Sequence, residues 1–85
     1  MVSQLSISSP AQYRIAVQGS LDENWSATLG MRVAVGHDRD KHPVTTLTGE
    51  VVDQAMLLGV LNYVLDLGMP IILVQWLDAD DPVAT

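Results

Sequence analysis

The chain has 85 residues, enough for one small domain, and 48% of them are hydrophobic while 16% are charged. This composition excludes a disordered protein, because disorder requires low hydrophobicity and high charge. The absence of cysteine excludes disulfides and thiolate chemistry, and ten acidic residues against four basic ones give a net charge of −6. We therefore expect no nucleic-acid partner, because the phosphate backbone would be repelled.

The two ends of the chain differ in composition from its middle. Residues 1–10 are polar and rich in serine, and residues 78–85 contain Asp78, Asp80 and Asp81. We expect both ends to fray and the acidic end to help keep the protein soluble. The prediction is one domain over residues 11–77, between a flexible N-terminal arm and an acidic C-terminal tail.

No stretch of the chain is typical of a secretory signal or a membrane span. The N-terminal residues lack a basic region and include several serines and Pro10. The most apolar stretch, residues 51–77, is interrupted by Asp53, Asp66 and the Gly68-Met69-Pro70 break. The uncharged pieces are shorter than the roughly 20 residues that a spanning helix needs. We therefore expect a cytoplasmic protein with no membrane partner.

The first half of the predicted domain contains two strands around a short helix. Tyr13, Ile15 and Val17 alternate with other residues over 13–18, as in a strand with one buried face. Asp22 is a candidate N-cap for a helix of about two turns that ends before Gly30. Alternation over residues 31–36 then predicts the second strand.

The second half predicts two further strands around a longer helix. A polar loop over residues 38–43 leads into a strand over 44–48, which we expect Gly49 and Glu50 to end. Apolar residues at helical spacing predict a helix over 52–67, and the proline after it stops that helix. Residues 71–77 form the last predicted strand.

The resulting order is strand, helix, strand, strand, helix, strand. This order predicts an α+β fold of the ferredoxin-like plait type. With right-handed crossovers, it has a four-stranded antiparallel sheet with a short first helix and a long second helix on one face.

The long helix and the last strand carry more apolar residues than one copy of this fold can bury. Leu58 and Leu65 lie on the side of the helix opposite its apolar stripe. In the last strand, strict alternation puts one apolar group on each face: Ile72, Val74 and Trp76 on one, and Ile71, Leu73 and Leu77 on the other.

Large exposed apolar patches on small proteins usually mark partner surfaces. We therefore predict an oligomer interface, most simply that of a two-fold homodimer, made by Leu58, Leu65, Ile72, Val74 and Trp76. One alternative is that these side chains fill the space left by the short first helix. Another is that a different protein covers them.

His37, Asp38, Asp40 and His42 gather in the polar loop and are residue types that bind metals. Arg39 and Lys41 lie among them and repel a cation, so we predict a solvated hairpin, with no metal and no cofactor. The two histidines are the groups that titrate near neutral pH. They would be the first general-base candidates in an enzyme, although no nucleophile lies near them in the sequence.

Three segments resemble the VQGxLDxxWS, LTGxVxDQAxLxGLL and DLGxPL segments of a group of short uncharacterised bacterial proteins. In this chain they are VQGSLDENWS (17–26), LTGEVVDQA (47–55) and DLGMP (66–70). The similarity covers roughly residues 13–77 and implies no activity, because that group has no assigned function. This chain departs from the group on the long helix, where Leu58, Tyr63 and Leu65 replace polar or basic residues.

We therefore predict a self-associating binding or interaction module without catalytic activity. The alternative is a cofactor-independent enzyme of the dimeric α+β barrel type that holds a small apolar substrate between sheet and helices. A third interpretation is an accessory subunit of a larger complex. The ligand, the partner and the oligomer number are left open.

Overall fold

The computed structural model describes residues 10–77, and this part of the chain forms four strands and two helices. The elements are β1 (Ala11–Gln18), α1 (Trp25–Leu29), β2 (Arg32–His37), β3 (Pro43–Val51), α2 (Gln54–Asp66) and β4 (Ile71–Leu77). Their order is the predicted one. The predicted arm up to residue 9 and the acidic tail over 78–85 lie outside the described residues. Within residues 10–77, no helix has the length and apolar character needed to cross a membrane.

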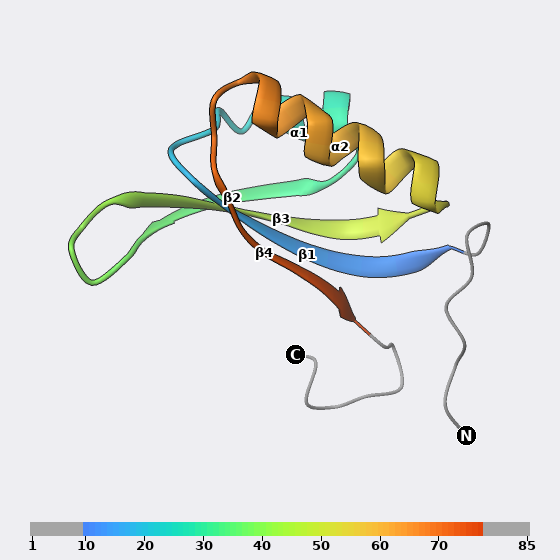
Figure 1. Cartoon of the computed structure of the whole chain (residues 1–85), viewed down its shortest axis with the longest axis horizontal. Coiled ribbons are helices and arrows are strands. Elements are labelled where there is room, and N and C mark those ends of the chain that lie inside the picture. The colour runs from blue at the N-terminus through green and yellow to red at the C-terminus, as the bar shows by residue number, and fades with distance from the viewer. Residues whose placement is uncertain (1–9, 78–85) are drawn as a thin grey trace.

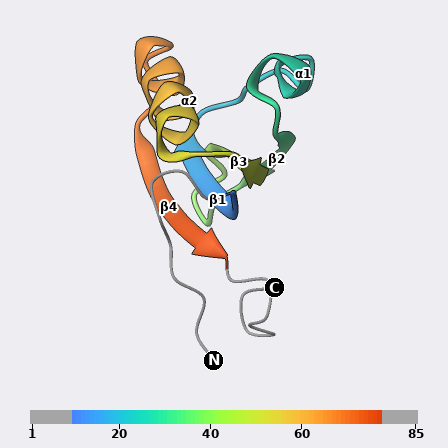
Figure 2. The same cartoon turned by 90° about the vertical axis from the view of Figure 1, so that its right-hand side faces the viewer.

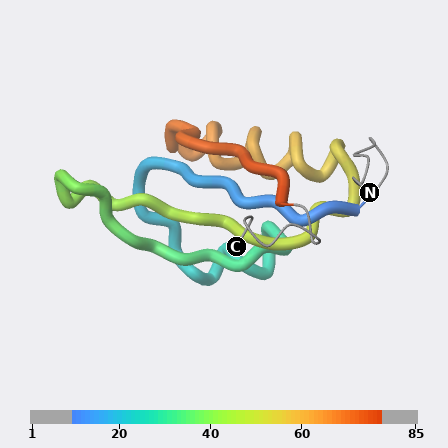
Figure 3. The backbone as a smooth tube through the Cα atoms, turned by 90° about the horizontal axis from the view of Figure 1, so that it is seen from below, coloured from blue at the N-terminus to red at the C-terminus, as the bar shows by residue number. Residues whose placement is uncertain are grey.

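The strands of the described region form one antiparallel sheet in the order β2-β3-β1-β4. Both helices lie on the same face of this sheet (Figure 1), which confirms the predicted α+β arrangement. Figure 2 shows α2 over the β4 side of the sheet and α1 over the β2 side. Figure 3 shows the other face from below, which we call the open face, and the β2–β3 hairpin extending beyond the other strands.

The core lies between the helices and the sheet. The predicted alternation of β1 is confirmed, because Tyr13, Ile15 and Val17 are all buried. Leu47 and Val51 of β3 face the same layer, and α2 adds three side chains at helical spacing: Leu57, Val60 and Val64. Burial of each large apolar side chain contributes roughly 1.5–3 kcal/mol, so this layer holds the helices on the sheet.

The first helix is shorter than predicted. It begins after Asn24 rather than Asp22 and has only five residues. The Asp22 carboxylate instead accepts a hydrogen bond from the Asn24 backbone N–H at 2.9 Å. Aspartate side chains commonly close such turns by accepting from the backbone N–H two residues on, so Asp22 shapes the turn before the helix and does not cap the helix itself.

The third strand is longer than predicted, because Gly49 and Glu50 do not end it. Gly49 pairs with Tyr13 in the ladder, and the strand continues to Val51. A Cβ at Gly49 would lie 3.4 Å from the Met31 Cα atom. The glycine therefore lets the chain after α1 pass close over β3, a long-range contact that a local turn signal does not reveal.

The second helix begins where Asp53 caps it. The Asp53 carboxylate accepts a hydrogen bond from the Met56 backbone N–H at 2.8 Å, and the helix spans 13 residues. Gln54 in the first turn donates to the Tyr13 hydroxyl at 2.8 Å. Beyond the helix, Gly68 has a positive φ of 81°, which favours glycine at a helix end.

We expect the Asp53→Ala variant to lower the free energy of unfolding by about 1 kcal/mol, because one backbone N–H of α2 loses its partner. Urea denaturation followed by circular dichroism measures this change. Asp66→Ala is the matched control, since it removes the same charge from the opposite end of α2. Equal losses in the two variants would contradict a capping role for Asp53.

Candidate interaction surface

The strand β4 lies at one edge of the sheet. Its inner side pairs with β1, and no strand of residues 10–77 pairs with its outer side. Its sequence, IILVQWL, contains no charged residue and no proline. Proteins usually protect edge strands with such residues, because the free backbone N–H and C=O groups recruit another strand. The outer side of β4 is therefore suited to pairing with a further strand.

The register of β1 and β4 assigns the side chains of β4 to the two faces. Val74 lies opposite the buried Ile15, so Val74 is on the helix side of the sheet. Leu73 lies opposite Ala16 and therefore on the open face. Trp76 shares the helix side with Val74, since it lies opposite Tyr13, and packs partly buried against the core.

A register shift at the start of β4 makes one sequence prediction wrong. The register shifts between Ala16 and Val17, so that Ile71 lies opposite Val17 on the helix side. Strict alternation had put Ile71 on the same face as Leu73. A bulge adds a residue to one strand and breaks the period of two. Ile72, next to this shift, is 57% exposed.

The side of α2 that faces away from α1 adds two exposed leucines. Leu58 and Leu65 are 58% and 51% exposed. At about 100° per residue they lie within about 20° of each other on the helix circumference. Tyr63 lies on the opposite flank and contacts Trp25 of α1, with ring centroids 5.1 Å apart. The two leucines therefore point toward the β4 side of the molecule, where Figure 2 places α2.

The structure thus places the predicted interface residues on two adjacent elements at one edge of the molecule. We call this set the β4–α2 surface: Leu58, Leu65, Ile72, Val74 and Trp76. Val74 is 41% exposed and Trp76 is half-buried, whereas the other three are more than half exposed. Four of the five therefore keep much of their apolar surface in contact with solvent.

A groove between the two helices was not predicted from the sequence. It has a volume of about 420 Å³, and its lining includes Thr28, Gly30, Met56, Gly59 and Tyr63. Its lining residues include no carboxylate, histidine or lysine, so the hydroxyls of Thr28 and Tyr63 are its side-chain polar groups. Two of its lining residues, Gly30 and Gly59, carry no side chain. The two glycines are only a weak sequence signal for a groove, because a glycine in a helical pattern can have a packing, capping or functional role.

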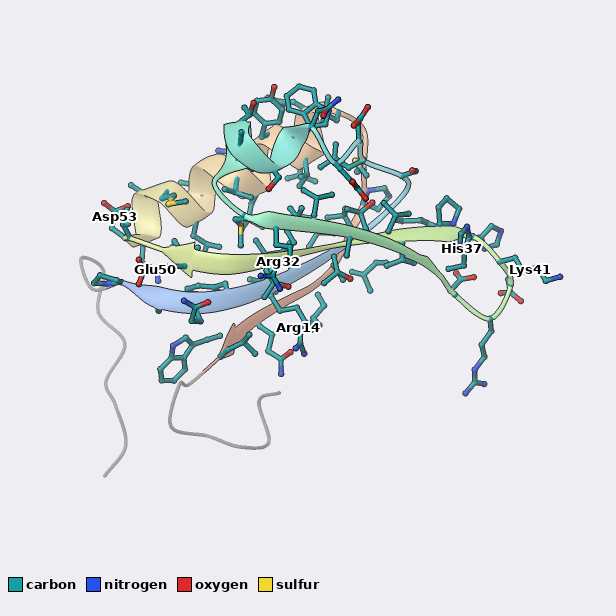
Figure 4. The ribbon with its side chains drawn as sticks, turned by 180° about the vertical axis from the view of Figure 1, so that it is seen from behind. Arg14, Arg32, His37, Lys41, Glu50 and Asp53 are labelled. Atoms are coloured by element: carbon teal, nitrogen blue, oxygen red, sulfur yellow. The ribbon has the colours of Figure 1, made fainter. Side chains whose placement is uncertain are left out.

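The tip of the β2–β3 hairpin holds the predicted polar cluster. Ligand atoms of Asp38, Asp40 and His42 lie within 4.8 Å of one another, and all three residues are exposed. His37 is outside this group and pairs with Pro43 in the last strand pair before the loop. Figure 4 shows His37 and Lys41 at the far end of the hairpin, away from the helices.

The Asp38 carboxylate holds the hairpin turn together. Its Oδ1 atom accepts hydrogen bonds from the backbone N–H groups of His42 at 2.9 Å and Asp40 at 2.8 Å. Its Oδ2 atom lies 3.5 Å from Nδ1 of His42. The His42 backbone N–H is the main cause that lowers the pKa of Asp38, because it stabilises the ionised form. These contacts stabilise the turn. That the loop binds no metal stays a prediction.

We expect the hairpin turn to loosen in acid. Since the folded-state pKa of Asp38 is lowered, its stabilising effect is complete above the ordinary value of about 3.9. That effect is lost as the pH falls through the lowered value. The amide shifts of Asp40 and His42 in an NMR titration measure the loss. In Asp38→Asn the same amide shifts should change little over this pH range. If they changed with pH as much as in the parent, the loosening would have to be assigned to a group other than Asp38.

The family model described as "Domain of unknown function (DUF8691)" matches residues 12–75 of the chain. The chain belongs to this family. The DUF8691 match spans all of α2 and most of β4, so both parts of the β4–α2 surface fall largely within it. Comparison with curated proteins and with solved structures found no match.

Residues in the segments 17–26, 47–55 and 66–70 have structural roles in this DUF8691 domain. Gly19 has a positive φ of 120°, Asp53 caps α2, and Gly68 follows its end. Ser26 donates from its hydroxyl to the Met31 carbonyl at 2.7 Å and so closes the turn after α1. These positions support the backbone.

Proposed function

We propose that this protein is a self-associating interaction module without catalytic activity, and that two copies form a homodimer through the β4–α2 surface. The observation that carries this proposal is the uncharged outer edge of β4 beside the exposed leucines of α2. Either feature alone is common on small proteins. Together they offer backbone pairing and apolar burial at one place.

A two-fold axis perpendicular to the sheet would pair β4 with β4 of the second copy in antiparallel orientation. The two sheets, each of four described strands, would then continue into each other. Because both helices lie on one face of the sheet, the two α2 helices would meet above the junction. Leu58 and Leu65 of each copy would there be covered by the other copy.

The apolar side chains supply the favourable free energy of this association. Full burial of leucine, isoleucine or valine contributes roughly 1.5–3 kcal/mol. The half-exposed side chains of the β4–α2 surface therefore retain a large part of that gain for binding. Pairing of β4 would also satisfy its outer N–H and C=O groups, although these are already hydrated in the monomer.

The proposal includes two finer statements. The fold is a ferredoxin-like plait, which is supported by the strand order β2-β3-β1-β4 and by helices on one face. The protein acts in the cytoplasm, which is in keeping with a chain that has no cysteine and needs no disulfide.

Analytical ultracentrifugation tests the proposal on the full chain. We expect a species of twice the 9.2 kDa chain mass at micromolar concentration, and dissociation on dilution. A single 9.2 kDa species across the whole concentration range would contradict self-association. Poor solubility alone, with recovery only beside a different chain, would favour an accessory subunit instead.

The enzyme alternative gains no support from the described residues. A dimeric α+β barrel packs two open faces together around a substrate, whereas the open face here carries Arg14, Arg32 and Glu50. His37 and His42 lie on the hairpin, outside the groove between the helices. Replacing both histidines with alanine should leave self-association unchanged, whereas an enzyme that used either as a base would lose its activity.

A further inference from the structure

The open face of the sheet carries a row of hydrogen-bond donors that crosses every described strand. Thr48 of β3 pairs with Arg14 of β1 on one side and with Arg32 of β2 on the other. Gln75 of β4 lies opposite Arg14 and accepts a hydrogen bond from its Nη1 atom at 3.4 Å. Figure 4 shows both arginines projecting from the face that carries no helix.

This row is basic in a strongly acidic protein. Two of the four basic residues of the chain are Arg14 and Arg32, and the other two lie in the hairpin loop. Among residues 10–77, no carboxylate lies within salt-bridge distance of either arginine. Glu50 is the acidic residue that the described strands place on the open face, and it pairs with Gln12 rather than with an arginine position. The row is thus free to receive a negatively charged group.

We propose that the acidic segment over residues 78–85 of this same chain docks on the open face and that its aspartates contact Arg14 and Arg32. The segment contains Asp78, Asp80 and Asp81. It follows Leu77, whose partner across the ladder is Gln12, so it starts on the sheet two residues from the Arg14–Gln75 pair.

The length of the segment is sufficient for this contact. Asp80 and Asp81 lie three and four residues past Leu77, so they can extend about 10–13 Å from it. The distance from β4 to β2 is three strand spacings, or about 14 Å. Both aspartates can therefore reach Arg14 on the strand next to β4, and Asp81 can reach Arg32 when the length of the arginine side chain is added, without any rearrangement of the sheet.

Tethering favours this segment over an acidic peptide from another protein. A single exposed ion pair shifts a local equilibrium by about fivefold at most, which holds a free peptide only weakly. A short connection raises the effective concentration into the millimolar range, so the same pairs hold an attached segment. Docking on the open face leaves the outer edge of β4 uncovered, and the proposal is therefore independent of the homodimer.

NMR relaxation of the full chain tests the proposal, because docking restrains the backbone. We expect order parameters above about 0.6 for the amides of Asp80 and Asp81 at low salt, and values below it in the Arg14→Gln/Arg32→Gln variant. High salt should lower the parent's values in the same way, since exposed charges are screened. The Arg39→Gln/Lys41→Gln variant is the matched control, because it removes the same charge at the hairpin and should change nothing.

A second variant guards against loss of folding in the arginine variant. Replacing Asp78, Asp80 and Asp81 with asparagine leaves the described sheet intact and should shift the side-chain NεH signals of both arginines. Low order parameters in the parent would overturn the proposal, as would equal losses in the hairpin control. A response of both arginines to an added aspartate hexapeptide, with residues 78–85 mobile in the parent, would assign the face to a separate acidic partner and also overturn it.

Discussion

The Leu58→Asp/Leu65→Asp variant is expected to be monomeric where the parent is a dimer, with a dissociation constant raised at least about 100-fold. Each protomer would bring two carboxylates into an apolar interface, and an unpaired buried charge costs several kcal/mol. A change of 2.8 kcal/mol already corresponds to about 100-fold in affinity. Sedimentation equilibrium across a dilution series measures this change.

Two further variants make this experiment specific. Ala27→Asp adds a charge to the exposed side of α1, over the β2 side of the sheet and away from the two leucines, and should leave the dissociation constant unchanged. Ile72→Lys places a charge on the edge strand, where lysine opposes strand pairing, and should weaken the dimer as well. If only the helix variant weakened association, the two copies would pack through α2 without pairing of β4.

Replacing Thr45 with valine is expected to lower the free energy of unfolding by about 2 kcal/mol. Thr45 is fully buried on β3, and its hydroxyl donates to the Gly19 carbonyl at 2.7 Å while accepting from the Leu21 N–H at 3.0 Å. Valine keeps the shape but leaves the Leu21 N–H without this acceptor, so the loop between β1 and α1 loses its attachment to the sheet.

Thermal unfolding at fixed protein concentration measures the effect, and for a domain of this size the expected fall in Tm is roughly 10 °C. Thr46→Val is the matched control, because Thr46 is the next residue on the same strand and faces the half-exposed open side. Equal losses in the two variants would show that the β3 threonines act through strand propensity and not through this pair of hydrogen bonds.

The sequence was sufficient for the order of the elements and for the buried face of β1, because both depend on local periodicity. It was not sufficient where a distant segment decides the outcome. Gly49 has the signature of a turn, yet it pairs with Tyr13 within β3 and leaves room for the close approach of Met31. Alternation likewise misassigned Ile71, because a register shift in the ladder is not visible in the spacing of apolar residues.

The candidate surface was predictable for a different reason. Leu58 and Leu65 break the pattern of an ordinary surface helix, and a ferredoxin-like plait has its last strand at an edge of the sheet. What the sequence could not supply was the open face, since the alignment of Arg14 and Arg32 on either side of Thr48 depends on the pairing of three strands. The groove beside α1 was equally hidden, because it depends on how the end of α1 and the helix α2 lie next to each other.

The extended β2–β3 hairpin has a practical consequence. Its tip is exposed from Asp38 to His42, and it contributes no side chain to the buried core or to the β4–α2 surface. A fluorophore attached at Arg39 through an introduced cysteine would be the only thiol adduct in a chain that otherwise has no cysteine. Such a labelled protein could report assembly by energy transfer between copies while leaving the β4–α2 surface and the open face unmodified.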